Sequence, residues 1–256
     1  MNKIYEPSNV PGPLPQDIKQ VSFSPAAIVR CLLYCICFLL LAHIAGFILD
    51  YVLHSHSRFT EKMLQYFDLN LENNFPSFFS ALILAFSALL LLIIYFYEKI
   101  NNIKSARYWL VLGLIFIFLS FDESIQIHED LAKFIRPKLA TDLSGFLYWA
   151  WVVPYAFFVL AVVIYFMRFV LNLPTFTRNL FFLSGFIYIS GALGLELLEG
   201  YFFKLYGLNH IYNRILYFTE ELMEMMGVTI FIYALLKYMA SHSIIISIRQ
   251  KPAAKN

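Results

Sequence analysis

The chain has 256 residues, of which 60% are hydrophobic and 14% are charged, and its formal net charge at pH 7 is +2. Water-soluble domains are about 45–50% apolar, so this composition excludes a soluble globular protein and indicates an integral membrane protein. The small net charge gives no reason to expect a nucleic acid partner, and the length fits one compact domain.

Six windows are long and apolar enough to cross a hydrocarbon core, which takes about 20 helical residues. They span residues 26–53, 76–98, 107–131, 144–170, 178–202 and 212–240. Their apolar runs are continuous, whereas the strands of a transmembrane barrel alternate between apolar and polar residues. We therefore expect an all-α fold, a polytopic bundle of six transmembrane helices within residues 26–240. A flexible cytoplasmic arm is expected at residues 1–25 and a cytoplasmic tail at residues 241–256.

The distribution of Lys and Arg predicts the orientation, because cytoplasmic segments of membrane proteins are enriched in these residues. With both termini in the cytoplasm, the inner segments hold twelve of the 19 basic residues and the outer segments hold seven. The sequence therefore predicts that both termini are cytoplasmic.

Three acidic segments interrupt these windows at the ends that this orientation places outside the cell. They are LSFDESIQIHEDL at residues 119–131, LELLEG at residues 195–200 and TEELMEMMG at residues 219–227. At 1.5 Å per helical residue, all three lie at a similar depth in the bilayer. An ionised carboxylate in lipid costs about 2.5 kcal/mol or more, so these side chains should face the bundle interior.

The fifth window carries small residues that predict close packing against neighbouring helices. They are Gly185, Ser190, Gly191, Ala192 and Gly194. We expect this packing to bring Glu196 close to the third and sixth helices. If the third helix continues to residue 131, His128 lies away from the face that carries Asp122 and Glu129.

So many clustered carboxylates predict a divalent metal centre, because Fe, Mn or Zn would neutralise them and accept carboxylate and imidazole ligands. A dinuclear site is expected, although neither Glu-x-x-His nor His-Glu-x-x-His occurs in these segments. A core neutralised by protons or salt bridges is the alternative, with Asp130 and Glu221 merely solvated. The candidate ligands are Asp122, Glu123, His128, Glu129, Glu196, Glu199, Glu220 and Glu224.

Four further polar residues on the predicted outer side are open candidates for this site: His54, His56, Glu72 and His210. Glu72 precedes Pro76, a residue typical of the first turn of a helix, so an interfacial turn with a helix cap is the competing interpretation. His43 stands alone in the middle of the first window and is interpreted as a packing residue.

Four segments together resemble a family of predicted bacterial multi-helix membrane proteins that has no established activity. They are DLNLENNFPSFFS, LSFDESIQIHE, LELLEG and EELMEMMG, and the resemblance covers residues 40–240. It implies a bacterial inner-membrane location but supplies no catalytic role, so the function has to be inferred from the site. A likeness to membrane hydrolases of the ceramidase type is weak, because their histidine-rich zinc signature is missing.

Two classes of function fit these features. The first is a metal-dependent enzyme, a hydrolase or an oxidase, whose extracytoplasmic mouth admits a lipid or another hydrophobic small molecule. The second is a divalent-cation or proton-coupled transporter that uses the same acids. Transporter sites tend to lie near the bilayer midplane, so acids near one face favour the enzyme. Membrane lipids are the expected partners in either case.

Overall fold

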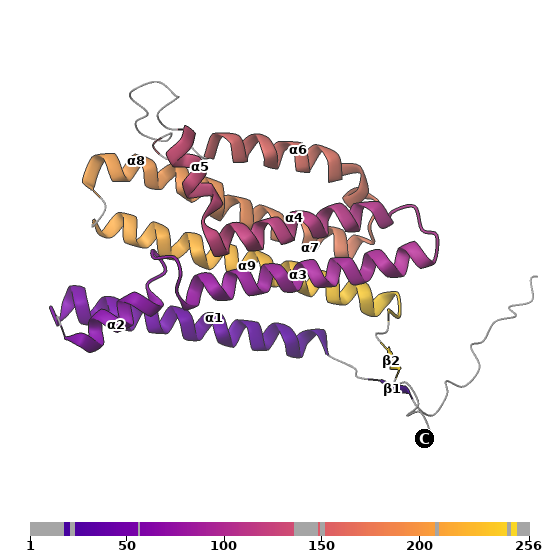
Figure 1. Cartoon of the computed structure of the whole chain (residues 1–256), viewed down its shortest axis with the longest axis horizontal. Helices are drawn as coiled ribbons and strands as arrows, with labels where there is room; N and C mark the ends of the chain where they lie inside the picture. Colours follow the sequence, from indigo (N-terminus) through magenta and orange to yellow (C-terminus); the bar gives the residue numbers. More distant parts are fainter. Residues whose placement is uncertain are drawn as a thin grey trace, which may run out of the picture.

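The computed structural model describes residues 18–20, 24–55, 57–135, 148, 152–207, 210–244 and 247–249 (Figure 1). Within this part of the chain, six helical stretches are long and apolar enough to cross a membrane. They are Pro25–Val52, Phe75–Ile100, Ala106–Ile125, Val152–Leu171, Thr175–Tyr206 and Ile211–Ser241. The predicted all-α bundle of six transmembrane helices is therefore confirmed, while the orientation of the termini stays a prediction.

Two of the six spans contain a π-helical segment. The first span is α1 (Pro25–Phe47) followed by η1 (Ile48–Val52), and the fifth is α7 (Thr175–Ile189), η4 (Ser190–Leu195) and α8 (Glu196–Tyr206). The other spans are α3 (Phe75–Ile100), α4 (Ala106–Ile125), α6 (Val152–Leu171) and α9 (Ile211–Ser241). The short helices α2 (Arg58–Phe67) and α5 (Ile127–Ile135) connect spans on one side of the bundle.

Most of the predicted arm and tail lies outside the described residues. The parts that are described form two three-residue strands, β1 (Ile18–Gln20) and β2 (Ser247–Arg249), which pair antiparallel beside the bundle (Figure 1). The chain segments that flank the bundle thus meet near one of its ends.

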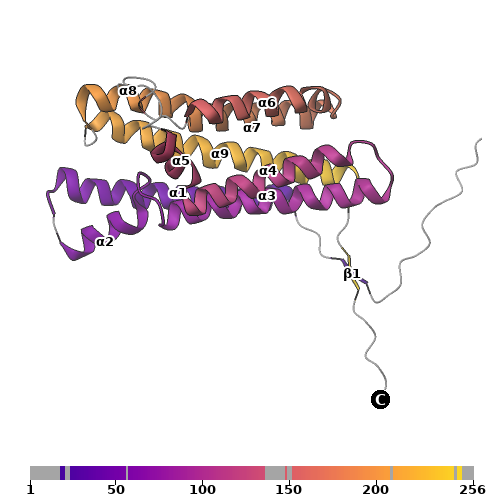
Figure 2. The same ribbon diagram turned by 45° about the horizontal axis from the view of Figure 1, so that its top comes forward.

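Helix α9 is the centre of the bundle. It lies between a layer of α1, α3 and α4 and a layer of α6, α7 and α8 (Figure 2). In α3 and α9, 56% of the most apolar stretch is buried, compared with 17% in each of the other four spans. The outer four spans therefore leave most of their apolar surface for lipid, and residues on α9 can reach both layers.

The start of α3 is held by a capping box, in which the Asn74 side chain accepts the Ser77 backbone N–H and the Ser77 hydroxyl accepts the Asn74 N–H. Pro76 occupies the first turn, as the sequence predicts. The Asn74 amide also donates to the carbonyls of Asp68 and Leu71. These bonds hold the loop before α3, which carries Glu72, against the helix start.

Glycines allow the fifth span to pack closely on α9. A Cβ atom on Gly227 of α9 would lie 2.9 Å from both the Cβ and the backbone N of Tyr188. A Cβ on Gly191 would lie 3.1 Å from the carbonyl oxygen of Glu220. The predicted close approach is thus confirmed at Gly191, whereas Gly185 and Gly194 face open space. The contact at Gly227 lay outside the small-residue pattern that the sequence suggested.

Candidate functional site

A cavity of about 810 Å³ is lined by residues of α4, α6, α7 and α9. One end is acidic, and its carboxylates belong to Glu72, Asp122, Glu123, Glu196, Glu199, Glu220, Glu221 and Glu224. The remainder is apolar, lined among others by Leu112, Phe116, Val162, Phe166, Phe181 and Phe231. The three acidic segments therefore do converge, and they converge on the end of a long hydrophobic cavity.

Three carboxylates at this end lie close enough to share an ion. One oxygen from each of Glu196, Glu199 and Glu220 lies within 4.8 Å of the other two. Oxygens bound to one ion at about 2.1 Å can be at most about 4.2 Å apart, so the spacing within the trio is close to what a shared ion requires. The Glu199 side chain is 1% exposed, and its Oε1 has no hydrogen-bond partner. Among the described residues, this trio is the group whose geometry suits a metal.

The π-helical segment η4 positions two members of the trio. It ends at Leu195, directly before Glu196, and the wider turn changes the direction in which later side chains point relative to α7. Because Gly191 has no side chain, η4 lies directly against α9 at Glu220 and Glu224. Glu196 and Glu199, one helical turn apart on α8, consequently meet Glu220 on α9.

The end of α4, and the turn that follows it, position His128. Helix α4 ends at Ile125 because Gln126 adopts the left-handed conformation, with φ 60° and ψ 43°. The chain then turns so that the backbone N–H of His128 donates to Asp122 Oδ1 at 2.8 Å. The expectation that His128 lies on a different face from Asp122 is therefore wrong, because it assumed one uninterrupted helix.

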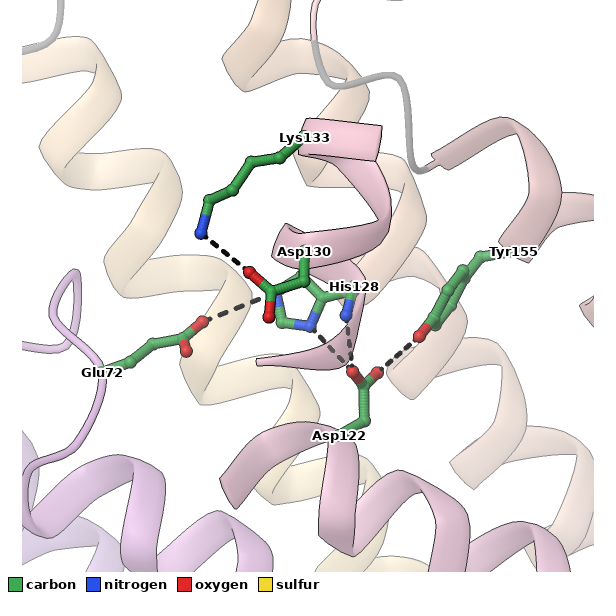
Figure 3. Close-up of polar contacts among 6 residues, drawn as sticks. All are labelled: Glu72, Asp122, His128, Asp130, Lys133 and Tyr155. Atoms are coloured by element: carbon green, nitrogen blue, oxygen red, sulfur yellow. Dashed lines mark hydrogen bonds and ion pairs between the residues drawn. The ribbon is translucent and has the colours of Figure 1, made fainter. Parts of the chain in front are cut away.

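The His128 ring links two carboxylates from different segments (Figure 3). Its Nδ1 is 3.2 Å from Asp122 Oδ1 and its Nε2 is 3.5 Å from Glu72 Oε1, while the Tyr155 hydroxyl donates to Asp122 Oδ2 at 2.9 Å. Burial lowers the pKa of His128, but its bonds to Asp122 and Glu72 outweigh burial and raise the pKa to about 10. A protonated imidazole has no free lone pair for a metal, so the predicted ligand role of His128 would require the loss of this proton.

The remaining acids connect the His128 network with the trio. Glu123, Glu221 and Glu224 are half-buried and line the cavity. Glu224 interacts electrostatically with both Glu123 and Glu196, so the carboxylates form one continuous group. Glu221, which the competing expectation treated as merely solvated, is part of the cavity wall. Asp130 is exposed, pairs with Lys133 at 3.0 Å and fits that expectation (Figure 3).

The open candidates differ in their position relative to the cavity. Glu72 lines the cavity, which the competing interpretation as a simple turn did not predict. His54 and His210 are not among the residues that line the cavity, and His210 instead caps α9 by accepting the Tyr212 N–H. His43 accepts the backbone N–H of Leu69 at 3.1 Å, so it anchors the loop before α3. His56 and the side chain of Glu129 lie outside the part of the chain that is described.

Comparison with known proteins assigns a family without assigning an activity. No curated protein and no solved structure matches the chain. The profile of a family described as "Domain of unknown function (DUF8692)" matches residues 32–239, which include all six spans except the first residues of α1 and the last of α9. The predicted membership of an uncharacterised family is confirmed: the chain belongs to the DUF8692 family.

Proposed function

We propose that this protein is a metal-dependent membrane enzyme that acts on a lipid or another hydrophobic small molecule. In this proposal Glu196, Glu199 and Glu220 bind a divalent ion, Fe, Mn or Zn, at the acidic end of the cavity. The observation that carries the proposal is the buried, unpartnered Oε1 of Glu199, which belongs to a carboxylate trio of ligating geometry.

Electrostatic repulsion supports an ion at the trio. Two like charges about 4 Å apart repel by roughly 4 kcal/mol at an effective dielectric of about 20. A carboxylate oxygen that is buried without a partner adds a desolvation cost of about 1–3 kcal/mol. A divalent ion would remove both costs at once, whereas a shared proton satisfies only one oxygen pair.

The position of the trio supports a catalytic role for that ion. A bound divalent ion can activate water or polarise a substrate oxygen. Glu123 and Glu224 line the same cavity and are available as a general base or as ligands of a second ion. The apolar walls would hold the hydrophobic part of a substrate, and the predicted orientation would place the acidic end on the extracytoplasmic side.

Metal content tests the first half of the proposal. Protein purified in detergent after metal-replete growth should contain at least one divalent ion per chain, measured by elemental analysis. Glu199→Gln keeps the shape but removes the charge and should lose the ion. Glu61→Gln, which removes an exposed carboxylate on α2, should keep it. The metal assignment fails if the parent protein lacks metal or if Glu199→Gln retains it.

Reconstitution tests the second half. Sealed proteoliposomes should show a change in lipid composition by mass spectrometry that disappears with chelator and with Glu199→Gln. An unchanged lipid profile together with Glu199-dependent uptake of divalent ions into the vesicles would instead establish the cation transporter.

A further inference from the structure

The apolar part of the cavity has the length of a hydrocarbon chain. On α6 the lining residues run from Tyr155 to Val170, which corresponds to about 22 Å at 1.5 Å per residue. The acidic end adjoins Tyr155, because this residue donates to Asp122. An extended apolar chain therefore fits lengthwise, with its polar end among the carboxylates.

The cavity also reaches the surface that lipid would cover. Phe158, Phe182 and Phe186 line it and are themselves 39%, 43% and 70% exposed. They lie on α6 and α7, two of the outer spans. A molecule already dissolved in the bilayer could thus enter from the side, without first crossing water.

The polar end contains many more acidic side chains than basic ones. Among the described residues that line the cavity, there are eight carboxylates and two basic side chains, His128 and Lys133. Both bases are already paired, His128 with Asp122 and Glu72, and Lys133 with Asp130. A divalent ion at the trio would engage only three of these acids, so an anionic head group would still lie beside acidic side chains.

Aromatic rings lie beside the acids that the trio does not use. Tyr148, Tyr155, Tyr188 and Tyr217 line the same end of the cavity. Tyr188 interacts electrostatically with each of Glu123, Glu221 and Glu224. Aromatic faces and carboxylates together are the groups that recognise organic ammonium ions. The buried, unpartnered Oε1 of Glu199 is a further acceptor in this cavity.

We propose that the cavity takes a single-chain amphiphile with an ammonium head group. The head lies among Glu123, Glu221 and Glu224, and the hydrocarbon chain extends along α6 and α7. This inference rests on the proposed function, because it names the substrate class of the same cavity. It does not require the ion at the trio, since these three acids are separate from Glu196, Glu199 and Glu220.

Three probes of equal chain length test this choice: hexadecylamine, hexadecanol and hexadecanoate, each added at the same mole fraction to the protein in lipid nanodiscs at pH 7.5. Hexadecylamine should raise Tm by several degrees, and the neutral and anionic probes should raise it much less. Equal shifts with all three, or a larger shift with hexadecanol or hexadecanoate, would overturn the proposal.

Variants locate the two ends of the ligand. In the double variant Glu221→Gln and Glu224→Gln, the mole fraction of hexadecylamine that gives a half-maximal Tm shift should rise at least tenfold. The control Glu61→Gln should leave this mole fraction unchanged. If the double variant does not fold, Val162→Trp, which fills the apolar part without touching an acid, should give the same loss. Unchanged binding in the folded variants would refute the proposed pose.

The metal-binding variant separates this inference from the proposed function. Glu199→Gln that has lost its ion but still responds to hexadecylamine shows that the head group is recognised without the metal. If the parent protein contains metal but does not discriminate among the probes, the metal centre is supported and the ammonium head group is refuted.

Discussion

Replacing His128 with Gln would show how much the charged ring contributes to holding three segments together. The ring joins Asp122 at the end of α4 to Glu72 in the loop before α3, and Asp122 in turn accepts the hydroxyl of Tyr155 on α6 (Figure 3). Gln keeps the backbone N–H that donates to Asp122 and has a similar length. It cannot carry the positive charge, so the variant isolates the electrostatic contribution.

The pKa of His128 sets the upper limit of this contribution. It rises from an ordinary value of about 6.5 to about 10, and each pH unit of difference is worth about 1.4 kcal/mol. The charged ring therefore stabilises the folded state by at most about 5 kcal/mol. The side chain is 21% exposed, so water screens part of the interaction. We expect His128→Gln to cost about 2–4 kcal/mol near neutral pH.

The sign of the pH dependence follows from the raised pKa. Stabilisation by the ring is complete below pH 6.5, where the ring is also protonated in the unfolded chain. It falls as the pH rises from 6.5 towards 10, because the folded state then holds a proton that the unfolded state has released. The difference in Tm between parent and variant should therefore be largest near pH 6 and almost absent above pH 10.

Thermal unfolding in detergent between pH 6 and 10.5 provides the assay. His54→Gln, at an exposed histidine after η1, is the matched control and should leave Tm close to that of the parent. A difference for His128→Gln that is constant with pH, or that grows as the pH rises, would refute the ion pairs as a source of stability.

Two other predictions concern packing and orientation. Gly227→Ala should cost about 1–3 kcal/mol, because the new methyl group would lie 2.9 Å from Tyr188, and should lower Tm. The methyl group of Gly194→Ala would have no other atom within 4 Å, so this variant should leave Tm almost unchanged. Equal effects of the two variants on Tm would contradict the close crossing of α7 and α9. A reporter that functions only in the cytoplasm should be active when it is fused after Lys237. Activity of an exported reporter there would reverse the orientation and the outward-facing acidic end.

The six spans follow from the sequence because the requirements of a bilayer are local. Each span needs about 20 apolar residues whatever its neighbours are, and hydropathy reports this directly. The common depth of the acidic segments at residues 119–131, 195–200 and 219–227 also follows, since helical rise converts sequence position into height. The sequence alone therefore predicted the bundle and the level of the acidic site within it.

The assignment of partners among the acids depended on tertiary structure. Gln126 adopts a left-handed conformation that its residue type does not predict, and this conformation brings His128 back to Asp122. The π-helical turn of η4 and the contact at Gly191 decide that Glu196 and Glu199 meet Glu220. Such irregularities are stabilised by packing between helices far apart in sequence, so no local pattern encodes them.

The cavity is likewise a property of the assembled bundle. The apolar residues of α6 have the same composition whether they face lipid, a neighbouring helix or an internal space, because all three environments are apolar. Only the arrangement of α4, α6, α7 and α9 shows that residues from Tyr155 to Val170 line a space that ends among carboxylates. Hydropathy places a side chain in the membrane, and helix packing decides what that side chain faces there.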